Sequence, residues 1–131
     1  AFAPPMEIKE QQVFTDYEQG MQYAKQTGKP VILNFTGYGC VNCRKMEQYV
    51  LADSSVQARL KDYVLITLYV DSRQDANANE IEDGMENSRR QRENYGSNAQ
   101  PFYIQVDGQG NAVSEPCTFT TSPDKFLRWL E

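Results

Sequence analysis

Two cysteines separated by two residues are the part of the sequence best suited to chemistry. Cys40 and Cys43 follow a strand-forming run at residues 31–35 and precede a segment typical of a helix. At a helix start, unpaired backbone N–H groups and the dipole favour an anion, here a thiolate. In C-x-x-C motifs this lowers the thiol pKa from about 8.5 to roughly 3.5–7.5. We therefore expect Cys40 to be the reactive thiol and Cys43 to stay protonated until a mixed disulfide forms.

A dithiol of this kind supports disulfide exchange without any cofactor. Cys40 would attack a partner disulfide, and attack of Cys43 on Cys40 would then release the reduced partner. Two other interpretations stay open: a static structural disulfide, and a metal site with Cys117 as third ligand. A tetrahedral zinc site would need a fourth soft ligand, and the chain has three cysteines and no histidine. We expect neither metal nor cofactor.

Cys117 is the cysteine left over once the pair is assigned. Free cysteine is among the most buried residue types, so the simplest interpretation is a small core residue. The functional alternative is a thiol that acts in regulation or in a mixed disulfide.

The composition is that of one globular domain. The chain has 131 residues, of which 40% are hydrophobic and 24% charged. A net charge of -5 argues against nucleic acid or an anionic membrane as partner, and no 18-residue apolar run is present. The absence of histidine excludes Ser-His-Asp and Cys-His catalysis. We expect residues 1–12 to be a tail or linker and residues 13–131 to form the domain.

The pattern of the first half predicts alternating helices and strands. A helix capped by Thr15 or Asp16 should end near residue 27, before Gly28. The continuous apolar run at 31–35 predicts a central strand covered on both faces, and residues 64–70 a second one. Between them we expect a helical stretch and a short helix through residues 56–63. The helical stretch should place three residues on one side: Met46, Tyr49 and Val50.

Residues 72–94 form a polar and charged insertion. We interpret it as a solvated loop and helix held partly by local charge pairing, with a docking surface as the alternative. Ile81 and Met85 are four residues apart and are the apolar positions expected to pin that helix to the domain.

The last third of the chain predicts a β-hairpin and a closing helix. Residues 102–106 alternate in polarity, which predicts a strand with Phe102, Ile104 and Val106 in the core. The turn at 107–110 should lead into an antiparallel return strand at 111–114. Ser122 followed by a proline is typical of a helix start.

The order of these elements, with C-x-x-C after the central strand and Tyr95-Gly96 before Pro101, resembles the thioredoxin family over residues 14–130. The resemblance implies an α/β fold with a central mixed sheet flanked by helices. Within that family, three segments are most similar to the C-terminal domain of the DsbD family of thiol–disulfide interchange proteins. They are Lys29-Pro30-Val31, the run from Cys40 to Glu47, and Asp53-Ser54-Ser55-Val56.

The resemblance also implies roles for individual residues. Cys40 would be the exposed nucleophile, Cys43 the resolving cysteine and Pro101 a cis proline facing the pair. A cis X-Pro bond costs only about 0.5–1 kcal/mol. The backbone of Gln100 would pair with a substrate chain in the manner of a strand.

Two departures from the thioredoxin pattern stand close to the pair. Gly39 replaces the tryptophan that usually precedes the first cysteine, and Asn34 replaces a buried aspartate, so a proton-exchanging group is missing there. Tyr38 is either a substitute lining of the substrate groove or simply an aromatic residue on the loop. Glu47 is the candidate replacement acid–base group by likeness to DsbD, and its alternative is a surface glutamate paired with a nearby cation.

By resemblance, the chain is a reductant that relays electrons in the bacterial envelope, a role tied to electron transport and cytochrome c biogenesis. Electrons would arrive from a membrane-embedded cysteine pair and leave to other extracytoplasmic thiol proteins through transient mixed disulfides. A periplasmic location follows from the likeness alone. The alternative is a non-catalytic thioredoxin-fold binding module that uses the groove beside Pro101.

Overall fold

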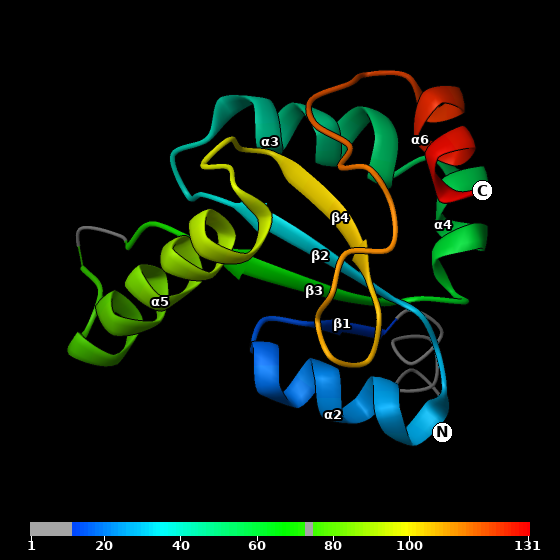
Figure 1. The fold of residues 1–131 in the computed structure, drawn as a ribbon. Helices are drawn as coiled ribbons and strands as arrows, with labels where there is room; N and C mark the ends of the chain where they lie inside the picture. The colour runs from blue at the N-terminus through cyan, green and yellow to red at the C-terminus, as the bar shows by residue number, and fades with distance from the viewer. Residues whose placement is uncertain (1–11, 73–74) are drawn as a thin grey trace, which may run out of the picture.

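The computed structural model describes residues 12–72 and 75–131, which fold around a four-stranded sheet (Figure 1). The strands lie in the spatial order β1-β3-β2-β4. Strand β3 is parallel to both of its neighbours, and β4 is antiparallel to β2. Their bounds are β1 (Gln12–Phe14), β2 (Val31–Thr36), β3 (Val64–Tyr69) and β4 (Phe102–Val106).

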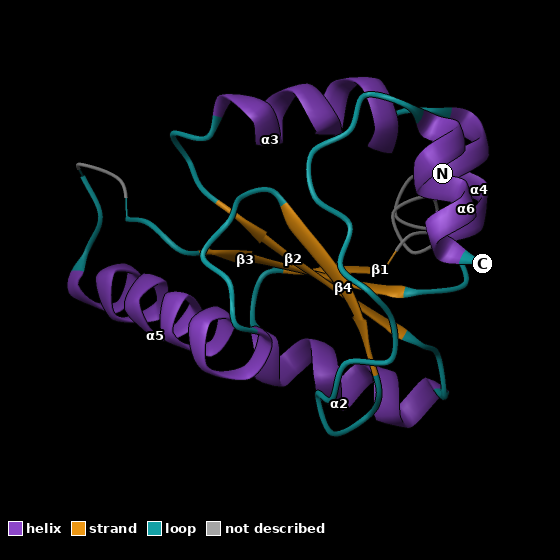
Figure 2. Cartoon of the chain, turned by 45° about the horizontal axis from the view of Figure 1, so that its top comes forward, coloured by secondary structure: helices purple, strands orange, loops and turns teal. Residues whose placement is uncertain are grey.

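Helices cover both faces of this sheet (Figures 1 and 2). On one face lie α2 (Tyr17–Thr27) and α5 (Ala78–Tyr95). On the other face lie α3 (Val41–Met46), the π-helix η1 (Glu47–Leu51), α4 (Ser54–Leu60) and α6 (Pro123–Leu130). The predicted mixed sheet flanked by helices is confirmed. Within the described ranges, no helix is long and apolar enough to cross a membrane.

The strand before the cysteine pair is buried on both faces, as its continuous apolar pattern predicts. All six residues of β2 are buried, and the strand lies between β3 and β4. Because successive side chains alternate across a strand, Leu33 and Phe35 join the core under α2, whereas Ile32 joins the core under α3. The sheet therefore separates two apolar clusters.

The predicted first helix begins and ends where the sequence indicates. Asp16 is its N-cap, with a carboxylate that accepts the Gln19 N–H at 2.9 Å. Gly28 is its C-cap in the left-handed region at φ 74°, where a glycine carries no steric penalty.

The prediction that Ile81 and Met85 pin the helix of the insertion is wrong. Helix α5 forms, but Ile81 is 44% exposed and Met85 68% exposed, so neither pins it to the domain. The face turned inward carries Gly84 and Gln91 instead. Gly84 lies against the backbone of Asp71, just after β3, and the Gln91 amide donates to the Ala99 carbonyl at 2.7 Å. The helix thus contacts the domain through backbone packing and a satisfied hydrogen bond rather than through Ile81 and Met85.

Tyr49 is also misplaced by the sequence pattern. Met46 and Val50 are buried as predicted, whereas Tyr49 is 55% exposed. The helix continues after Met46 as the π-helix η1, whose i→i+5 bonding changes the angular spacing of side chains from that of an α-helix. The spacing of an α-helix therefore does not predict which side chains of η1 are buried.

The return strand predicted at 111–114 is reduced to isolated bridges. Ala112 bridges Val106, and Cys117 bridges Tyr103. Tyr103 is 1% exposed, so β4 does not alternate between core and solvent as predicted. The reason is that β4 has apolar layers on both faces, since Tyr103 packs edge-to-face on Phe126 of α6 at 5.4 Å.

One strand was not predicted. β1 spans three residues and pairs with β3 from Gln12 onward. The remainder of the predicted tail, residues 1–11, lies outside the described residues. A three-residue strand is too short to give a periodic signal.

Candidate active site

The redox pair lies at the junction of β2 and α3, as the sequence predicts. Cys40 is the N-cap of α3, with extended backbone angles of φ -88° and ψ 104°. Its Sγ accepts the backbone N–H of Cys43 at 3.1 Å. The N-cap side chain is the group that satisfies unpaired N–H groups at a helix start, and in the reduced protein this place favours a thiolate.

Cys40 and Cys43 form a disulfide with a Cα–Cα distance of 5.3 Å. The two sulfurs differ in exposure. Cys43 is 1% exposed beneath α3, while Cys40 is partly exposed and Val41 beside it is 67% exposed. A partner protein can therefore reach Cys40 but not Cys43.

The Gln100–Pro101 peptide bond is cis, as the resemblance implies. Pro101 is buried and Gln100 is partly exposed. Phe102 pairs with Phe35 across the sheet, so Pro101 lies at the sheet end from which the redox loop leaves. The topology thus brings the cis proline to the same end of the molecule as the cysteine pair.

The loop between β2 and Cys40, residues 37–39, is held from two sides. Arg44 Nη2 donates to the Gly37 carbonyl at 3.2 Å and to Thr36 Oγ1 at 3.1 Å. The Asp71 carboxylate accepts the backbone N–H groups of Tyr38 at 2.8 Å and of Gly39 at 3.4 Å. A cation and an anion from different elements therefore fix the backbone that leads into the nucleophile.

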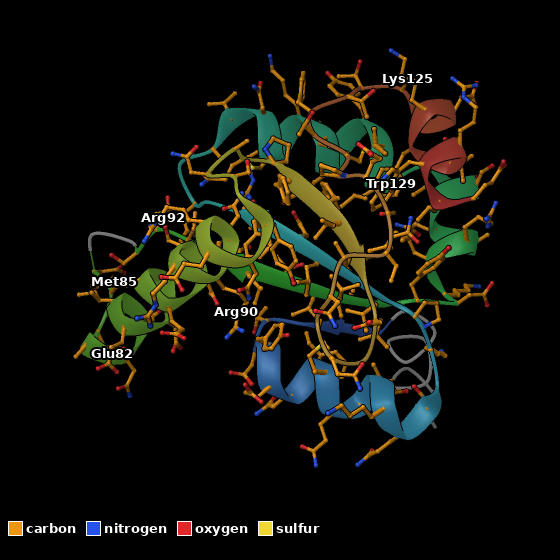
Figure 3. All side chains as sticks on the ribbon, in the orientation of Figure 1. Glu82, Met85, Arg90, Arg92, Lys125 and Trp129 are labelled. Carbon is orange, nitrogen blue, oxygen red and sulfur yellow. A yellow bond between two sulfur atoms is a disulfide. The ribbon has the colours of Figure 1, made fainter. Side chains whose placement is uncertain are left out.

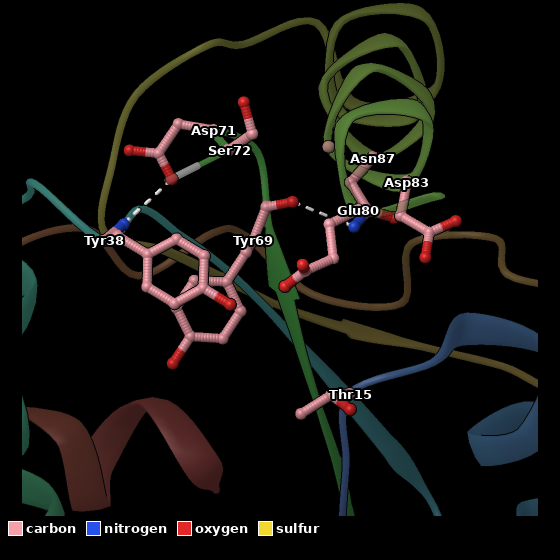
Figure 4. A pocket seen from close by; sticks show the side chains of 9 residues that line it. Thr15, Tyr38, Tyr69, Asp71, Ser72, Glu80, Asp83 and Asn87 are labelled. Atoms are coloured by element: carbon pink, nitrogen blue, oxygen red, sulfur yellow. Dashed lines mark hydrogen bonds between the residues drawn. The ribbon is translucent and has the colours of Figure 1, made fainter. Parts of the chain in front are cut away.

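Tyr38 is 38% exposed and stacks on Tyr69, with ring centroids 4.0 Å apart and planes 15° apart. The two rings, Asp71 and residues of α5 line a pocket beside the redox loop (Figure 4). Asn87 of α5 donates to the Tyr69 carbonyl at 2.9 Å on the same side. Tyr38 thus belongs to a fixed wall beside the pair. Gly39, next to it, is exposed and leaves open space before Cys40.

Glu47 forms an ion pair with Arg44, Oε2 to Nη2 at 3.1 Å. The glutamate side chain is 37% exposed and the arginine side chain 42%, so the pair itself adds little to stability. Glu47 nonetheless lines the same open groove as Asn34. The ion pair matches the interpretation of Glu47 as a surface glutamate paired with a cation, and its acid–base role stays a prediction.

The face beneath α3 contains polar groups in an apolar layer. Asn34 is 2% exposed, and its Oδ1 has no hydrogen-bond partner among the described residues. Tyr103 pairs with Asn34 across β2 and β4. Burial, and then the negative charge of Glu47, raise the pKa of Tyr103 above its usual range. The charge of Glu47 thus acts on Tyr103 in this layer.

Cys117 lies on this same face as a free, partly buried cysteine. It packs against the cluster under α3, and its backbone exchanges two hydrogen bonds with Tyr103 at 2.7 and 2.8 Å. Burial raises its pKa to about 11. In residues 12–72 and 75–131, no group of three or more histidine, cysteine, aspartate or glutamate side chains is placed to hold a metal ion.

Asp71 was missed at the level of sequence, although a signal for it existed. It follows β3 directly, and β3 is parallel to the strand that precedes the cysteine pair. The carboxyl ends of parallel neighbours share one edge of a sheet, so a carboxylate just after the second strand lands beside the redox loop.

A helix-capping, half-exposed cysteine, a buried second cysteine and a cis proline on this mixed sheet define a thioredoxin-fold protein with a redox-active pair. The thioredoxin-like family matches residues 11–108, and the chain belongs to that family.

Curated relatives match part of the chain. The thiol:disulfide interchange protein DsbD of Vibrio vulnificus (strain CMCP6) is 41% identical over 51 residues, which is 39% of this chain and 9% of that protein. DsbD 1 of Pseudomonas aeruginosa is 46% identical over 43 residues, which is 33% of this chain and 7% of that protein. The matched segment thus spans less than a tenth of either relative.

Solved structures match nearly the whole chain and support the fold. DsbH oxidoreductase superposes with a TM-score of 0.72 at 21% identity, covering 92% of this chain and 82% of that one. The DsbD c-terminal domain of Neisseria meningitidis in its oxidised form gives a TM-score of 0.61 at 24% identity, covering 90% and 96%.

Proposed function

We propose that this chain is a thiol–disulfide oxidoreductase domain that exchanges electrons with protein partners through Cys40 and Cys43. The observation that carries the proposal is the asymmetry of the disulfide, with an accessible sulfur at a helix N-cap and a second sulfur sealed beneath it. A purely structural disulfide has no need of that asymmetry.

The reaction follows from this geometry. In the reduced pair, the Cys40 thiolate attacks one sulfur of a partner disulfide, and the partner's other sulfur leaves as a thiolate that takes up a proton. Cys43 then loses its proton and attacks Cys40 Sγ, which breaks the mixed disulfide. The second partner sulfur leaves and is protonated. The partner gains two electrons and two protons, and the pair is left as the disulfide seen here.

Glu47 is proposed as the group that accepts the proton from Cys43. Asn34 cannot serve, because an amide does not exchange protons in this range, whereas Glu47 lines the same groove and is one turn beyond Cys43. Glu47→Gln should slow resolution of the mixed disulfide without slowing the first attack by Cys40. Equal slowing of both steps would assign Glu47 only to its ion pair with Arg44.

The partner chain is proposed to dock at the end of the sheet that carries the cis proline. Gln100 and Pro101 lie on one side of that end, and Tyr38 and Gly39 on the loop beside it. An extended partner segment could pair with the Gln100 backbone while its disulfide meets Cys40. Such redox encounters need only small, transient interfaces.

The direction of electron flow is proposed to be reductive, in the bacterial envelope, with electrons received from a membrane-embedded cysteine pair. The likeness to DsbD supports this. Equilibration of the pair against glutathione buffers should then give a potential nearer that of thioredoxin, about −270 mV, than that of the oxidant DsbA, about −120 mV. A value near the oxidising end would reverse the assignment.

A disulfide-reduction assay on a model disulfide protein tests the activity itself. The wild type should catalyse reduction by a small thiol, Cys40→Ser should lose this activity, and Cys43→Ser should accumulate a mixed disulfide on Cys40. Cys117→Ser is the matched control and should stay active. Wild-type protein with no more activity than Cys40→Ser would support the binding-module alternative instead.

A further inference from the structure

Asp71 is an acidic residue whose carboxylate accepts backbone N–H groups of the redox loop. It follows β3 and faces residues 37–39, with Oδ1 accepting from Tyr38 N at 2.8 Å and Oδ2 from Gly39 N at 3.4 Å (Figure 4). Nothing in the exchange chemistry itself uses this residue.

The loop needs such an anchor because its backbone is intrinsically loose. Two of its three residues, Gly37 and Gly39, are glycines, which lose the most conformational freedom on ordering. Within the loop, Arg44 holds only the Gly37 carbonyl, which also accepts the Cys40 N–H at 3.3 Å. The two amides nearest to Cys40 are held by Asp71.

Asp71 is itself fixed from behind. The Val70 N–H donates to the Thr36 carbonyl at 2.9 Å, which ties the end of β3 to the end of β2. On the other side Gly84 of α5 packs against the backbone of Asp71, where an added Cβ would lie 3.5 Å from the Asp71 carbonyl carbon. The carboxylate therefore has a rigid base from which to hold the loop.

We infer that Asp71 is a positioning residue, whose carboxylate fixes the backbone of Tyr38 and Gly39 so that Cys40 is presented as the N-cap of α3. The inference deepens the proposed function, because the capping position is what favours the Cys40 thiolate. Asp71 acts through the loop backbone and not on the reacting sulfurs.

Asp71 has two effects on the Cys40 thiolate, and they shift the pKa of the thiol in opposite directions. The sign of the measured shift therefore tells which effect is larger. Anchoring the loop preserves the Cys43 N–H bond to Cys40 Sγ and stabilises the thiolate, whereas the negative charge of Asp71 disfavours a nearby anion. The loop is exposed at Tyr38 and Gly39, so water screens the charge effect. Loss of a charge-assisted hydrogen bond is the larger effect.

The test measures the pH midpoint for alkylation of Cys40 in reduced protein, in a Cys117→Ser background. With Asp71→Ala the midpoint should rise by about one pH unit, which means roughly tenfold less thiolate at pH values below both midpoints. Asp71→Asn keeps one acceptor and should shift the midpoint by less than half as much. Asp83→Asn, which changes an exposed carboxylate of α5 that lines the same pocket, is the matched control and should leave it unchanged.

Gly37→Ala tests the same anchor if Asp71→Ala fails to fold. An added Cβ would lie 3.0 Å from Asp71 Oδ2, so the carboxylate must shift by a few tenths of an ångström, which should weaken its bonds to the loop and raise the midpoint while the charge stays in place. A midpoint in Asp71→Ala that is unchanged or lower, with the thermal unfolding transition intact, would overturn the inference. The same holds for an unchanged midpoint in Gly37→Ala.

The alkylation midpoint does not depend on turnover, so the two proposals can fail separately. Wild type that reduces no disulfide, together with a raised midpoint in Asp71→Ala, would refute the oxidoreductase function and leave the positioning role standing. An active wild type with an unshifted midpoint would do the reverse.

Discussion

The two faces of the sheet are built differently, although both are buried. The cluster under α2 is made of apolar side chains from three strands and one helix. The face under α3 contains Cys43 and Tyr103 in its buried layer, together with Asn34, whose buried Oδ1 has no partner among the described residues. A buried polar side chain with an unpartnered oxygen thus lies on the face that carries the redox pair. Departures from good packing rules are expected where function requires them.

Removing a large side chain from the apolar face should have the greatest effect on folding. Phe35 is fully buried and lies 5.8 Å from the ring of Tyr95 and 6.0 Å from that of Phe102. Phe35→Ala should lower the free energy of unfolding by about 3–5 kcal/mol, because a cavity remains where the ring was. Urea unfolding of the oxidised protein measures it, with Phe119→Ala, at 40% exposure, as the control. A loss below about 1 kcal/mol would contradict the comparison.

Burial on the face under α3 should make the thiol of Cys117 slow to react. With its pKa raised to about 11 by burial, Cys117 should be thiolate in only about one molecule in a thousand at pH 8, against about one in four for free cysteine. Iodoacetamide should then label native oxidised protein about a hundredfold or more slowly than urea-unfolded oxidised protein, in which Cys117 is again the only thiol. Because the folded pKa is raised, the stability linked to this thiol is complete below about pH 9 and is lost as the pH rises towards 11. Equal labelling rates would show that Cys117 is open to solvent.

An aspartate at position 34 would test how strongly the face under α3 disfavours a buried charge. Asn34→Asp places a carboxyl group where exposure is 2%, so desolvation should raise its folded pKa above the unfolded value near 3.9. The free energy of unfolding should be highest below that unfolded pKa and should fall as the pH rises through the folded pKa. The loss should be about 1.4 kcal/mol for each pH unit by which the folded pKa exceeds the unfolded one. Unfolding measured from pH 4 to pH 8 tests this, and Asn79→Asp on the exposed side of α5 should show no such slope. A flat profile in Asn34→Asp would mean that a partner compensates the charge.

The smallest effect is expected on the outer side of α5. Met85 is 68% exposed and projects away from the domain with Glu82 (Figure 3). Met85→Ser should change the free energy of unfolding by less than about 0.5 kcal/mol. Thermal unfolding of the variant beside wild type gives the answer. A clear destabilisation would restore the expectation from the sequence that Met85 pins the helix.

The sequence was most informative where residue type and local conformation agree. Continuous apolarity predicted that β2 is buried on both faces, and the C-x-x-C after it predicted that Cys40 lies at a helix start. The sequence pattern was wrong where contacts between distant segments decide which residues face the core. Gly84 packs inward while Met85 does not, because helix α5 meets the β3 end through its backbone. The contact of Asp71 with two amides over thirty residues away depends on the parallel pairing of β2 and β3, so it follows from topology rather than from a local pattern.

The backbone bridges between β4 and the residues that follow it affect self-association through the edge of the sheet. Edge strands with unpaired backbone groups invite other chains to add to the sheet. Here the residues after the turn bridge β4 at Val106 and again at Tyr103, so that edge is largely shielded. The bridges stop short of Gln100, which leaves the sheet end beside the cis proline unshielded by them. The shielded stretch of this edge is thereby distinct from the stretch beside Gln100 at which we propose that a partner docks.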